Sequence, residues 1–293
     1  MLYQTFLAGS KANLRWLYPR FFQAQCLPVM SHPPIRSIRM HDTDLKKTIV
    51  IGGISGGIGS ALATSLHKEG HALAGYARSS DNLDALASNL PGTSTKVLDA
   101  TNPNEVDAFI AETIQNNGRI DAYVHAIGSI LIKPAHLTTP ENWAHTLQTN
   151  LSSAFYALSA VVKHMQKQTS GGSCLFFSTA AAQTGIANHE AIAAAKGGIE
   201  AMVRSAAATY APRGIRINAI APSLTNTPLA QPIISSEKAL EISKRMHPLG
   251  DIAHSGDVAS LARWLLSVEA QFVTGQVFVI DGGLSTIVPK PRA

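Results

Sequence analysis

A cluster of glycines early in the chain has the character of a phosphate-binding turn. The β-branched run Ile49–Ile51 indicates a strand buried on both faces, and Gly53, Gly57 and Gly59 follow it before a helical segment begins at Ser60. We expect this turn to bind the pyrophosphate of a dinucleotide, because a helix N-terminus presents unpaired N–H groups and glycines let a phosphate approach the backbone. The spacing is neither the G-x-G-x-x-G fingerprint nor a P-loop, so an ordinary strand-to-helix connection is the alternative.

A second set of chemically competent residues lies on a helix predicted for His189–Ala211. His189 and Lys196 are seven residues apart, which places them two turns and ~10 Å apart on one helix face. We expect Asn188 to be the N-cap and His189 to lie in the first turn, where the helix dipole favours a neutral imidazole. Such a ring can polarise a substrate carbonyl by hydrogen bonding. The alternative is a histidine that faces solvent.

The composition and charge of the chain narrow its class. The formal net charge is +5, and five basic residues precede Asp42 with no acidic residue among them. The body beyond them is therefore formally neutral, and we expect no nucleic-acid partner. Cys26 and Cys174 are too few for a disulfide framework or a four-thiolate metal site, and we expect no metal. No apolar run approaches the ~20 residues that span a bilayer, so we expect no membrane partner.

Residues 1–41 differ in composition from the rest of the chain. They carry arginine but no acidic residue, which is typical of a mitochondrial presequence. The simpler interpretation, which we favour, is a leader that is disordered or not native, with the protein starting at Met40. We therefore expect a cytoplasmic protein with one domain over residues 42–293, or a protein of the mitochondrial matrix if the presequence is genuine.

From Lys46 onward, strand-like and helix-like patterns alternate. Such alternation predicts right-handed crossovers and one doubly wound parallel sheet with helices on both faces, a Rossmann fold of the α/β class. The predicted strands are Ile49–Ile51, His71–Ala77, Thr95–Asp99, Ile120–Ala126, Cys174–Ser178, Ile215–Ile220 and Val277–Ile280. The predicted helices are Ser60–Glu69, Asp81–Asn89, one opened by Asn102 and Pro103, Pro140–Lys167, His189–Ala211, Ser236–Arg245 and Asp257–Ser267.

Several motifs, in order, resemble those of the short-chain dehydrogenase/reductase family from about Lys46 to Leu284. The glycine turn Gly52–Gly59 is similar to the family's Thr-Gly-x3-Gly-x-Gly, and Val124–Gly128 is a loose version of its Asn-Asn-Ala-Gly segment. Arg216–Ser223 is similar to Arg-x-Asn-x3-Pro-Gly, with serine for the last glycine. The resemblance implies contacts to a nicotinamide dinucleotide from Gly53, Ser55, Gly57, Ile58, Gly59, Asp99, Ala100, Ala126, Gly128, Asn150, Lys196, Pro222 and Thr227.

One departure from the family's pattern concerns the proton donor. The family's catalytic motif is Tyr-x3-Lys, and here Ile192 stands at the tyrosine position before Lys196. In the family the tyrosine protonates the substrate oxygen, while the lysine lowers the tyrosine pKa and binds the nicotinamide ribose. The family's serine falls on Thr179, with Ser178 adjacent. The enoyl reductase branch places its tyrosine seven residues before the lysine, which is the position of His189.

Arg78 favours NADP(H) over NAD(H) as the cofactor. An NAD site has an acidic residue at the end of the second strand to bind the ribose 2′-hydroxyl. Here that strand is followed by Arg78 and two serines, and the first acid is Asp81. A cation beside small hydroxyl residues suits a 2′-phosphate, and a solvated surface arginine is the alternative.

Three functions are consistent with these residues. The first is an oxidoreductase that moves hydride between NADP(H) and a carbonyl or alcohol, with a non-standard proton donor. The second reduces the activated C=C bond of an enoyl thioester, with His189 in the donor position, and the third is a non-catalytic NADP(H)-binding module. The residues expected at the catalytic site are Lys196, Asn150, Thr179, Ser178 and His189.

The segment Thr225–Arg245 follows the sixth predicted strand, at the edge where such sheets bind ligands. Apolar residues in this segment and just before it suggest a lid over a small, partly apolar substrate. They are Leu224, Pro228, Leu229, Ile233 and Ile234. The resemblance also implies a homodimer or homotetramer that associates through the two long helices and the last strand.

Overall fold

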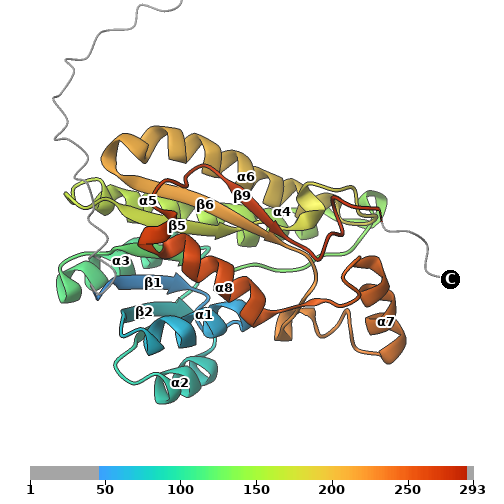
Figure 1. Ribbon diagram of the computed structural model, residues 1–293, viewed down its shortest axis with the longest axis horizontal. Helices are drawn as coiled ribbons and strands as arrows, with labels where there is room; N and C mark the ends of the chain where they lie inside the picture. The colour runs from blue at the N-terminus through green and yellow to red at the C-terminus, as the bar shows by residue number, and fades with distance from the viewer. Residues whose placement is uncertain (1–45, 289–293) are drawn as a thin grey trace, which may run out of the picture. The chain divides into compact units, whose positions relative to one another are not determined.

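The computed structural model describes residues 46–288, and within them seven parallel strands form one central sheet (Figure 1). The strands are β1 (Thr48–Gly52), β2 (Ala72–Ala77), β3 (Ser94–Val97), β4 (Ala122–His125), β5 (Gly172–Phe177), β6 (Ile215–Pro222) and β9 (Val277–Ile280). Their order is β3-β2-β1-β4-β5-β6-β9, and every neighbouring pair is parallel. The predicted doubly wound parallel sheet is confirmed. The leader predicted for residues 1–41 lies outside the described residues.

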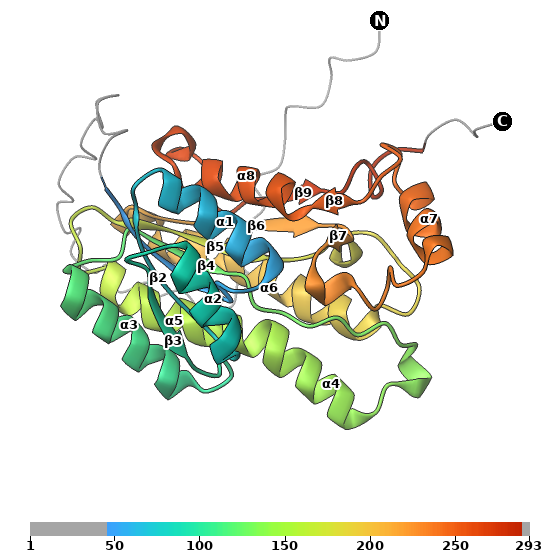
Figure 2. The same ribbon diagram turned by 90° about the horizontal axis from the view of Figure 1, so that it is seen from below.

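Helices cover both faces of this sheet (Figure 2). They are α1 (Gly57–Lys68), α2 (Ser80–Asn89), α3 (Pro103–Asn117), α4 (Pro140–Leu147), α5 (Ser153–Met165), α6 (Glu190–Tyr210), α7 (Glu237–Met246) and α8 (Ser255–Leu266). Helices α1 and α8 pack together on one face, and α3 packs on α5 on the other. The predicted cap Asn102 accepts a hydrogen bond from the Asn104 amide at the start of α3. A two-residue pairing of β7 (Thr225–Asn226) with β8 (Ala253–His254) was too short to be predicted.

The two faces of the sheet carry two separate hydrophobic clusters. Strand β1 is buried along its whole length because both faces are covered. Its Ile49 belongs to the cluster beneath α1 and α8, whereas the next residue, Val50, belongs to the cluster beneath α3, α5 and α6. Strand β1 also lies between β2 and β4, so the strand order reverses beside it. This switch point is where open α/β sheets bind ligands.

The helix predicted over residues 140–167 is interrupted at its centre by a π-helical turn, Gln148–Ser152. Asn150 Nδ2 donates to the Thr146 carbonyl at 3.0 Å, and Ser153 Oγ donates to the Thr149 carbonyl at 2.6 Å. The wider turn alters the backbone hydrogen bonding of these two carbonyls, and the two side chains donate to them. The same turn places Asn150 beside the loop after β4, where its Oδ1 accepts a hydrogen bond from the Ser129 amide.

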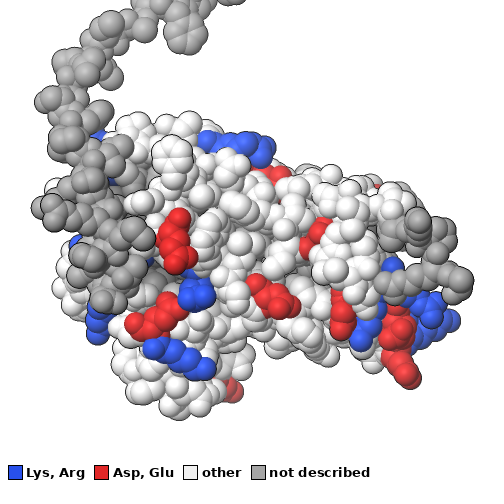
Figure 3. Space-filling model, viewed as in Figure 1, with Lys and Arg blue, Asp and Glu red and all other residues white. Residues whose placement is uncertain are grey.

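Basic and acidic side chains are interspersed on the face drawn in Figure 3. Ion pairs among the described residues include Lys163 with Asp107 at 3.2 Å and Arg263 with Glu69 at 2.8 Å. Both pairs are solvent-exposed, so each contributes little to stability. Within residues 46–288, no helix combines the length and the apolar character needed to cross a membrane.

A chain of buried hydrogen bonds crosses the sheet beneath the glycine turn. Tyr76 and Tyr123 hydroxyls are 2.7 Å apart, Tyr123 lies 2.9 Å from His125 Nδ1, and His125 Nε2 lies 3.0 Å from Ser153 Oγ. Ser153 donates onward to the Thr149 carbonyl, so the ring must donate from Nε2 and accept at Nδ1. Burial lowers the pKa of His125 to about 3, with Lys196 contributing, which keeps the ring neutral.

We expect Tyr123→Phe to lower the free energy of unfolding by about 1–3 kcal/mol, because it leaves His125 Nδ1 and the Tyr76 hydroxyl without partners. Tyr76→Phe should cost less, because only the Tyr123 oxygen loses a donor while its own donation to the ring persists. Urea unfolding of the two variants measures the difference. Equal losses of unfolding free energy in the two variants would contradict this assignment of donors and acceptors.

Candidate functional site

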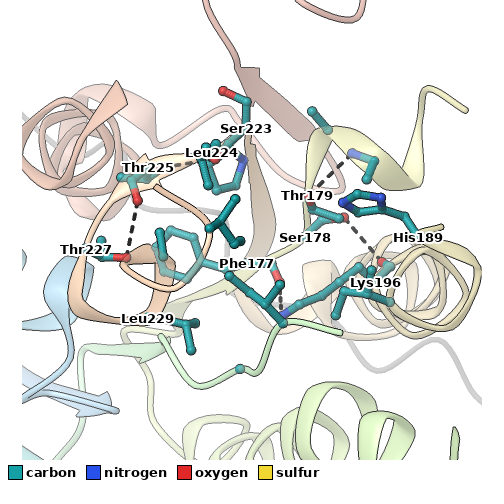
Figure 4. A pocket seen from close by; sticks show the side chains of 18 of the residues that line it. Phe177, Ser178, Thr179, His189, Lys196, Ser223, Leu224, Thr225, Thr227 and Leu229 are labelled. Carbon is teal, nitrogen blue, oxygen red and sulfur yellow. Dashed lines mark hydrogen bonds between the residues drawn. The ribbon is translucent and has the colours of Figure 1, made fainter. Parts of the chain in front are cut away.

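A cavity of about 350 Å³ lies at the carboxyl ends of β4, β5 and β6 (Figure 4). Its lining comes from the start of α1, the loop after β4, the end of β5, helix α6 and the segment after β6. Apolar side chains predominate, and the ionisable ones among the lining residues are Lys196, His189 and His247. All three are basic types, so the cavity suits a partly apolar ligand with an electron-rich polar end.

The glycine turn lies against this cavity in the conformation that its sequence requires. Gly53 has φ +78°, and a Cβ there would stand 2.6 Å from the Ala126 carbonyl oxygen. A Cβ on Gly57 would stand 2.7 Å from Thr227 Cβ, so the turn also adjoins the segment after β6. Helix α1 has Gly56 as its N-cap and no side-chain cap. Its first N–H groups are therefore available to a phosphate, as the sequence predicts.

Lys196 brings a buried cation to the cavity. Its side chain is 7% exposed, and Nζ donates to the Phe177 carbonyl at 2.9 Å (Figure 4). Desolvation by burial lowers the lysine pKa from 10.5 to about 8. No acidic side chain in residues 46–288 forms an ion pair with it. Ligand hydroxyls or negative charges placed near this ammonium would therefore interact with it more strongly than with a surface lysine.

Asn150 is used to build the site. Its Oδ1 accepts from the Ser129 amide at 3.0 Å, and its Nδ2 donates to Ser129 Oγ at 2.9 Å. A Cβ on Gly128 would stand 3.0 Å from that Oδ1 and 3.4 Å from Lys196 Nζ. The predicted group Gly128, Asn150 and Lys196 is thus brought together, with the Asn150 side chain holding the loop after β4.

The two neighbouring hydroxyls at the end of β5 have different roles. Ser178 donates to Glu200 Oε1 at 2.7 Å, so its hydrogen is committed to a buried carboxylate. Thr179 Oγ1 instead accepts from the Ala181 amide at 3.3 Å. Among the described residues, this is the one hydrogen bond of that hydroxyl. The Thr179 hydroxyl hydrogen is therefore free to donate to a substrate oxygen. Of the two predicted candidates, only Thr179 has an available donor.

His189 lines the cavity, but two expectations about it are wrong. Asn188 has φ +65° and does not cap α6; His189 is itself the N-cap and makes no side-chain cap bond. Its Nδ1 lies 2.7 Å from the Ala187 carbonyl, which must receive an N–H. A neutral ring then presents a bare Nε2, which accepts hydrogen bonds. The neutral imidazole predicted from the sequence cannot polarise a carbonyl from this position.

Ile192 lines the same cavity one turn before Lys196 and is 6% exposed. The position at which the family resemblance expects tyrosine is thus part of the apolar wall. Two cavity residues that the sequence did not suggest are Ser223 and His247, whose Oγ and Nε2 are 2.8 Å apart. Serine in place of the family's glycine after Pro222 was a visible signal for the first. No pattern marked His247.

Arg78 and Asp99, which are predicted to contact the dinucleotide, lie outside this cavity. Asp99 follows β3, and its pKa is lowered, chiefly by a hydrogen bond from the Thr101 amide, with the charge of Arg78 contributing. Arg78 follows β2 and is exposed, with no ion pair among the described residues. Arg78 and Asp99 therefore share the edge beside the glycine turn. Gly53, Ser55, Gly57, Gly59, Arg78, Asp99 and Ala100 do not line the cavity, whereas Ile58, Ala126, Gly128, Pro222 and Thr227 do.

Three of the five apolar residues of the predicted lid line the cavity, and its role as a lid stays a prediction. Leu224, Leu229 and Ile233 line the cavity, whereas Pro228 and Ile234 do not. The segment ends in α7, which contributes Ser243 and Met246. Among residues 46–288, no cluster of three or more metal-ligating side chains exists.

The sheet, its switch-point glycine turn and the cavity at its carboxyl edge define a Rossmann-type α/β protein. A family model described as enoyl-(acyl carrier protein) reductase matches residues 53–285. The 3-oxoacyl-[acyl-carrier-protein] reductase FabG of Thermotoga maritima is 33% identical, over 81% of this chain and 97% of its own length. A probable 2,4-dienoyl-CoA reductase of Bacillus subtilis is 29% identical, over 81% and 96% of the two chains.

Solved structures agree with these sequence relatives. A short-chain type dehydrogenase/reductase from Mycobacterium ulcerans matches with a TM-score of 0.78 at 28% identity, covering 82% of this chain and 91% of that one. ElxO with NADP bound matches with a TM-score of 0.77 at 27% identity, covering 82% and 99%. The chain belongs to the short-chain dehydrogenase/reductase family, as its motifs predicted.

Proposed function

We propose that this protein is an NADP(H)-dependent oxidoreductase that transfers hydride between the nicotinamide and a carbonyl or alcohol bound in the cavity. The observation that carries the proposal is the cavity itself, which joins the Lys196 cation and the free Thr179 hydroxyl beside the glycine turn. An apolar wall that includes Ile192 and Leu229 would exclude water from the reacting carbon.

Arg78 supports NADP(H) as the cofactor, because an exposed, unpaired guanidinium at the end of β2 is free to bind a 2′-phosphate. The matching ElxO structure was solved with NADP bound. The open N-terminus of α1 would hold the pyrophosphate, and Lys196 the nicotinamide ribose. When bound, NADPH supplies the hydride.

The chain's own residues would stabilise the negative charge that develops on the substrate oxygen. Thr179 would donate its free hydrogen to that oxygen, and the Lys196 ammonium would add a favourable field in a low-dielectric site. Among the described residues, no acidic side chain lines the cavity to oppose this charge. Ser178 and Glu200 would hold the end of β5 against α6 rather than touch the substrate.

The test is NADPH oxidation by the purified protein with diketones, quinones, β-ketoacyl thioesters and enoyl thioesters. Carbonyl substrates should be reduced, and NADH should support less turnover than NADPH. Arg78→Ala should weaken NADPH binding about tenfold or more and leave NADH binding within about twofold, since each tenfold is about 1.4 kcal/mol. NADPH binding without turnover of any substrate would favour the non-catalytic module instead.

Reduction of an enoyl thioester is the second candidate. The family model's description, the Bacillus subtilis dienoyl-CoA reductase relative and the position of His189 seven residues before Lys196 support it. Because a neutral His189 presents a bare Nε2, this ring would have to act as an imidazolium. Turnover confined to the enoyl thioesters, and lost in His189→Ala, would favour this second reaction.

We predict that Thr179→Val lowers kcat for carbonyl reduction by about tenfold to a hundredfold, because it removes a hydroxyl hydrogen aimed at the developing charge. Ser178→Ala is the matched control, and its effect on kcat should be much smaller because that hydroxyl is committed to Glu200. Steady-state kinetics on both variants checks the order. A larger loss for Ser178→Ala would reassign the substrate contact.

We also propose a homo-oligomer, as expected from the family resemblance. A shallow hollow on the surface of the π-helical turn, α5 and α6 supports this proposal, and it is lined by Leu151, Ser152, Phe155, Tyr156 and Met202. Phe155 is 56% exposed there and lies with the other apolar side chains of the hollow, and such a contiguous exposed patch is typical of a surface that another protein covers. Sedimentation analysis of the wild type and of Phe155→Glu measures the assembly.

A further inference from the structure

Ser223 and His247 form a directed hydrogen-bonded pair on the cavity wall. His247 is 3% exposed and ends α7, where its Nδ1 lies 2.7 Å from the Ser243 carbonyl. A carbonyl can only accept, so Nδ1 carries a proton. Nε2 lies 2.8 Å from Ser223 Oγ, so in the neutral state the Ser223 hydroxyl donates to the ring. When the ring is protonated, Nε2–H donates to Ser223 instead, and the hydroxyl hydrogen turns free.

Three other polar side chains of the cavity wall, those of Ser178, Thr179 and His189, have no comparable proton to pass on. Ser178 donates to a carboxylate oxygen that already accepts from Gln183. A neutral His189 keeps its single N–H on the Ala187 carbonyl. Thr179 has a free hydrogen, but the partner behind its oxygen is a backbone amide, which supplies no proton. Lys196 also carries protons, but its hydrogen-bond partner among the described residues is the Phe177 carbonyl, which can supply no replacement for a proton that leaves. Ser223 is the lining hydroxyl that is hydrogen-bonded to an imidazole among the described residues.

Charged groups of both signs lie close to His247 in space or in sequence. Asp281 follows β9 and is 6% exposed, with its carboxylate held by the Gly283 and Ser285 amides. Burial alone would raise the Asp281 pKa, yet these hydrogen bonds and the nearby His247 together lower it. On α7 itself, the nearest cations in sequence are Arg245, which is exposed, and Lys244, which pairs with Asp251 at 3.3 Å. A buried carboxylate therefore lies near the imidazole.

We propose that Ser223 and His247 form the proton relay of this enzyme and replace the tyrosine whose position Ile192 occupies. The relay rests on the proposed oxidoreductase function. In reduction, hydride reaches the carbonyl carbon and the π electron pair of the C=O bond moves to oxygen. That oxygen takes the Ser223 hydroxyl proton, and Ser223 Oγ takes the Nε2 proton of the His247 imidazolium, which leaves a neutral ring. Oxidation of the alcohol runs the same transfers in reverse.

The relay makes Ser223 a catalytic residue and His247 the group behind it. We expect Ser223→Ala to lower kcat for reduction about a hundredfold, as for loss of a general acid, with NADPH affinity within about twofold of the wild type. The dependence of kcat on pH should be weaker in this variant, because no side-chain hydroxyl then passes a proton from the imidazole to the substrate. Ser223→Thr keeps the hydroxyl and should restore at least about a tenth of the wild-type rate and the pH dependence.

Ser236→Ala is the matched control. Ser236 caps the opposite end of α7, so this substitution weakens the helix but leaves Ser223 and His247 unchanged. It should leave kcat within about threefold of the wild type. Wild-type protein that turns over no substrate overturns the oxidoreductase function and the relay together. An active wild type with Ser223→Ala at a similar rate and an unchanged pH profile overturns the relay alone.

A second readout does not depend on turnover. Long-range nitrogen–proton NMR of the histidine rings in the cofactor-free protein should find the neutral His247 protonated at Nδ1, and Ser223→Ala should shift its Nε2 resonance. A neutral ring protonated at Nε2 would donate to Ser223 permanently and could not accept its proton. That result would overturn the relay even in an active enzyme.

Discussion

Replacing Lys196 by methionine is expected to reduce kcat/KM for NADPH oxidation by more than about a hundredfold. The ammonium is buried at the cavity wall with one carbonyl partner, so its remaining donors are free for the ribose of the proposed cofactor. Hydrogen bonds to a charged donor contribute about 1.5–3 kcal/mol each, and about 1.4 kcal/mol corresponds to a factor of ten. The loss should appear in NADPH affinity measured by fluorescence as well as in turnover.

The same substitution should change how stability depends on pH. Burial lowers the Lys196 pKa from 10.5 in the unfolded chain to about 8 in the folded protein. Between these two values the unfolded chain binds more protons, so this lysine makes the free energy of unfolding rise with pH. Below about pH 8 both states are protonated, and its destabilising effect is complete. Lys196→Met should therefore remove a rise in stability between about pH 8 and about pH 10.5.

Urea unfolding of the wild type and Lys196→Met across this pH range measures the difference directly. Lys167→Met, which removes an exposed cation, controls for the loss of charge alone. NADPH affinity of the wild type should fall above about pH 8 as the ammonium is lost. Parallel stability curves for the wild type and Lys196→Met would mean that the lysine is not buried as described.

The sheet was predictable because its strands are buried on both faces. Consecutive residues such as Ile49 and Val50 must both be apolar when each contacts a different helical layer, and this constraint is visible in a single sequence. The alternation of such runs with helical patterns then leaves a parallel, doubly wound topology. The cap at Asn102 was predictable for a similarly local reason, because its side chain accepts from a backbone amide only two residues along the chain.

The details of the candidate site depend on contacts that local patterns do not encode. The π-helical turn follows from how Asn150 and Ser153 bond nearby carbonyls and the loop after β4, whereas the apolar periodicity of the segment fits an unbroken helix. The role of His189 depends on one carbonyl, that of Ala187, which fixes the proton on Nδ1. His247 escaped notice because its partner, Ser223, is 24 residues away.

These contacts also change which residues are expected to do chemistry. A sequence reading treats Ser178, Thr179, Asn150 and His189 as similar polar candidates. The structure distinguishes these four side chains by whether each donor hydrogen already has an acceptor. When His189 is neutral, Thr179 is the one among them whose donor hydrogen has none. If the family's tyrosine position falls on Ile192, as the resemblance implies, turnover needs a proton from another group of the cavity wall or from water.

Gly53→Ala is expected to destabilise the protein by about 3 kcal/mol or more and to abolish NADPH binding. Two costs combine at this position. The φ of +78° is a left-handed conformation that costs a residue with a Cβ about 1–2 kcal/mol. The new Cβ would also stand 2.6 Å from the Ala126 carbonyl oxygen, so the turn or the loop after β4 must shift. Either shift moves the amides at the start of α1 away from the proposed pyrophosphate.

Gly70→Ala separates the two costs. Gly70 has φ +80° at the end of α1, nearly the same backbone conformation, but nothing lies within 4 Å of a Cβ built there. This variant should lose only the conformational cost, about 1–2 kcal/mol, and keep its NADPH affinity. The difference between the two variants in urea unfolding then measures the close approach of the turn to Ala126. If Gly53→Ala unfolds no more easily than Gly70→Ala and still binds NADPH, the tight packing of the turn against the loop after β4 is not what makes the site.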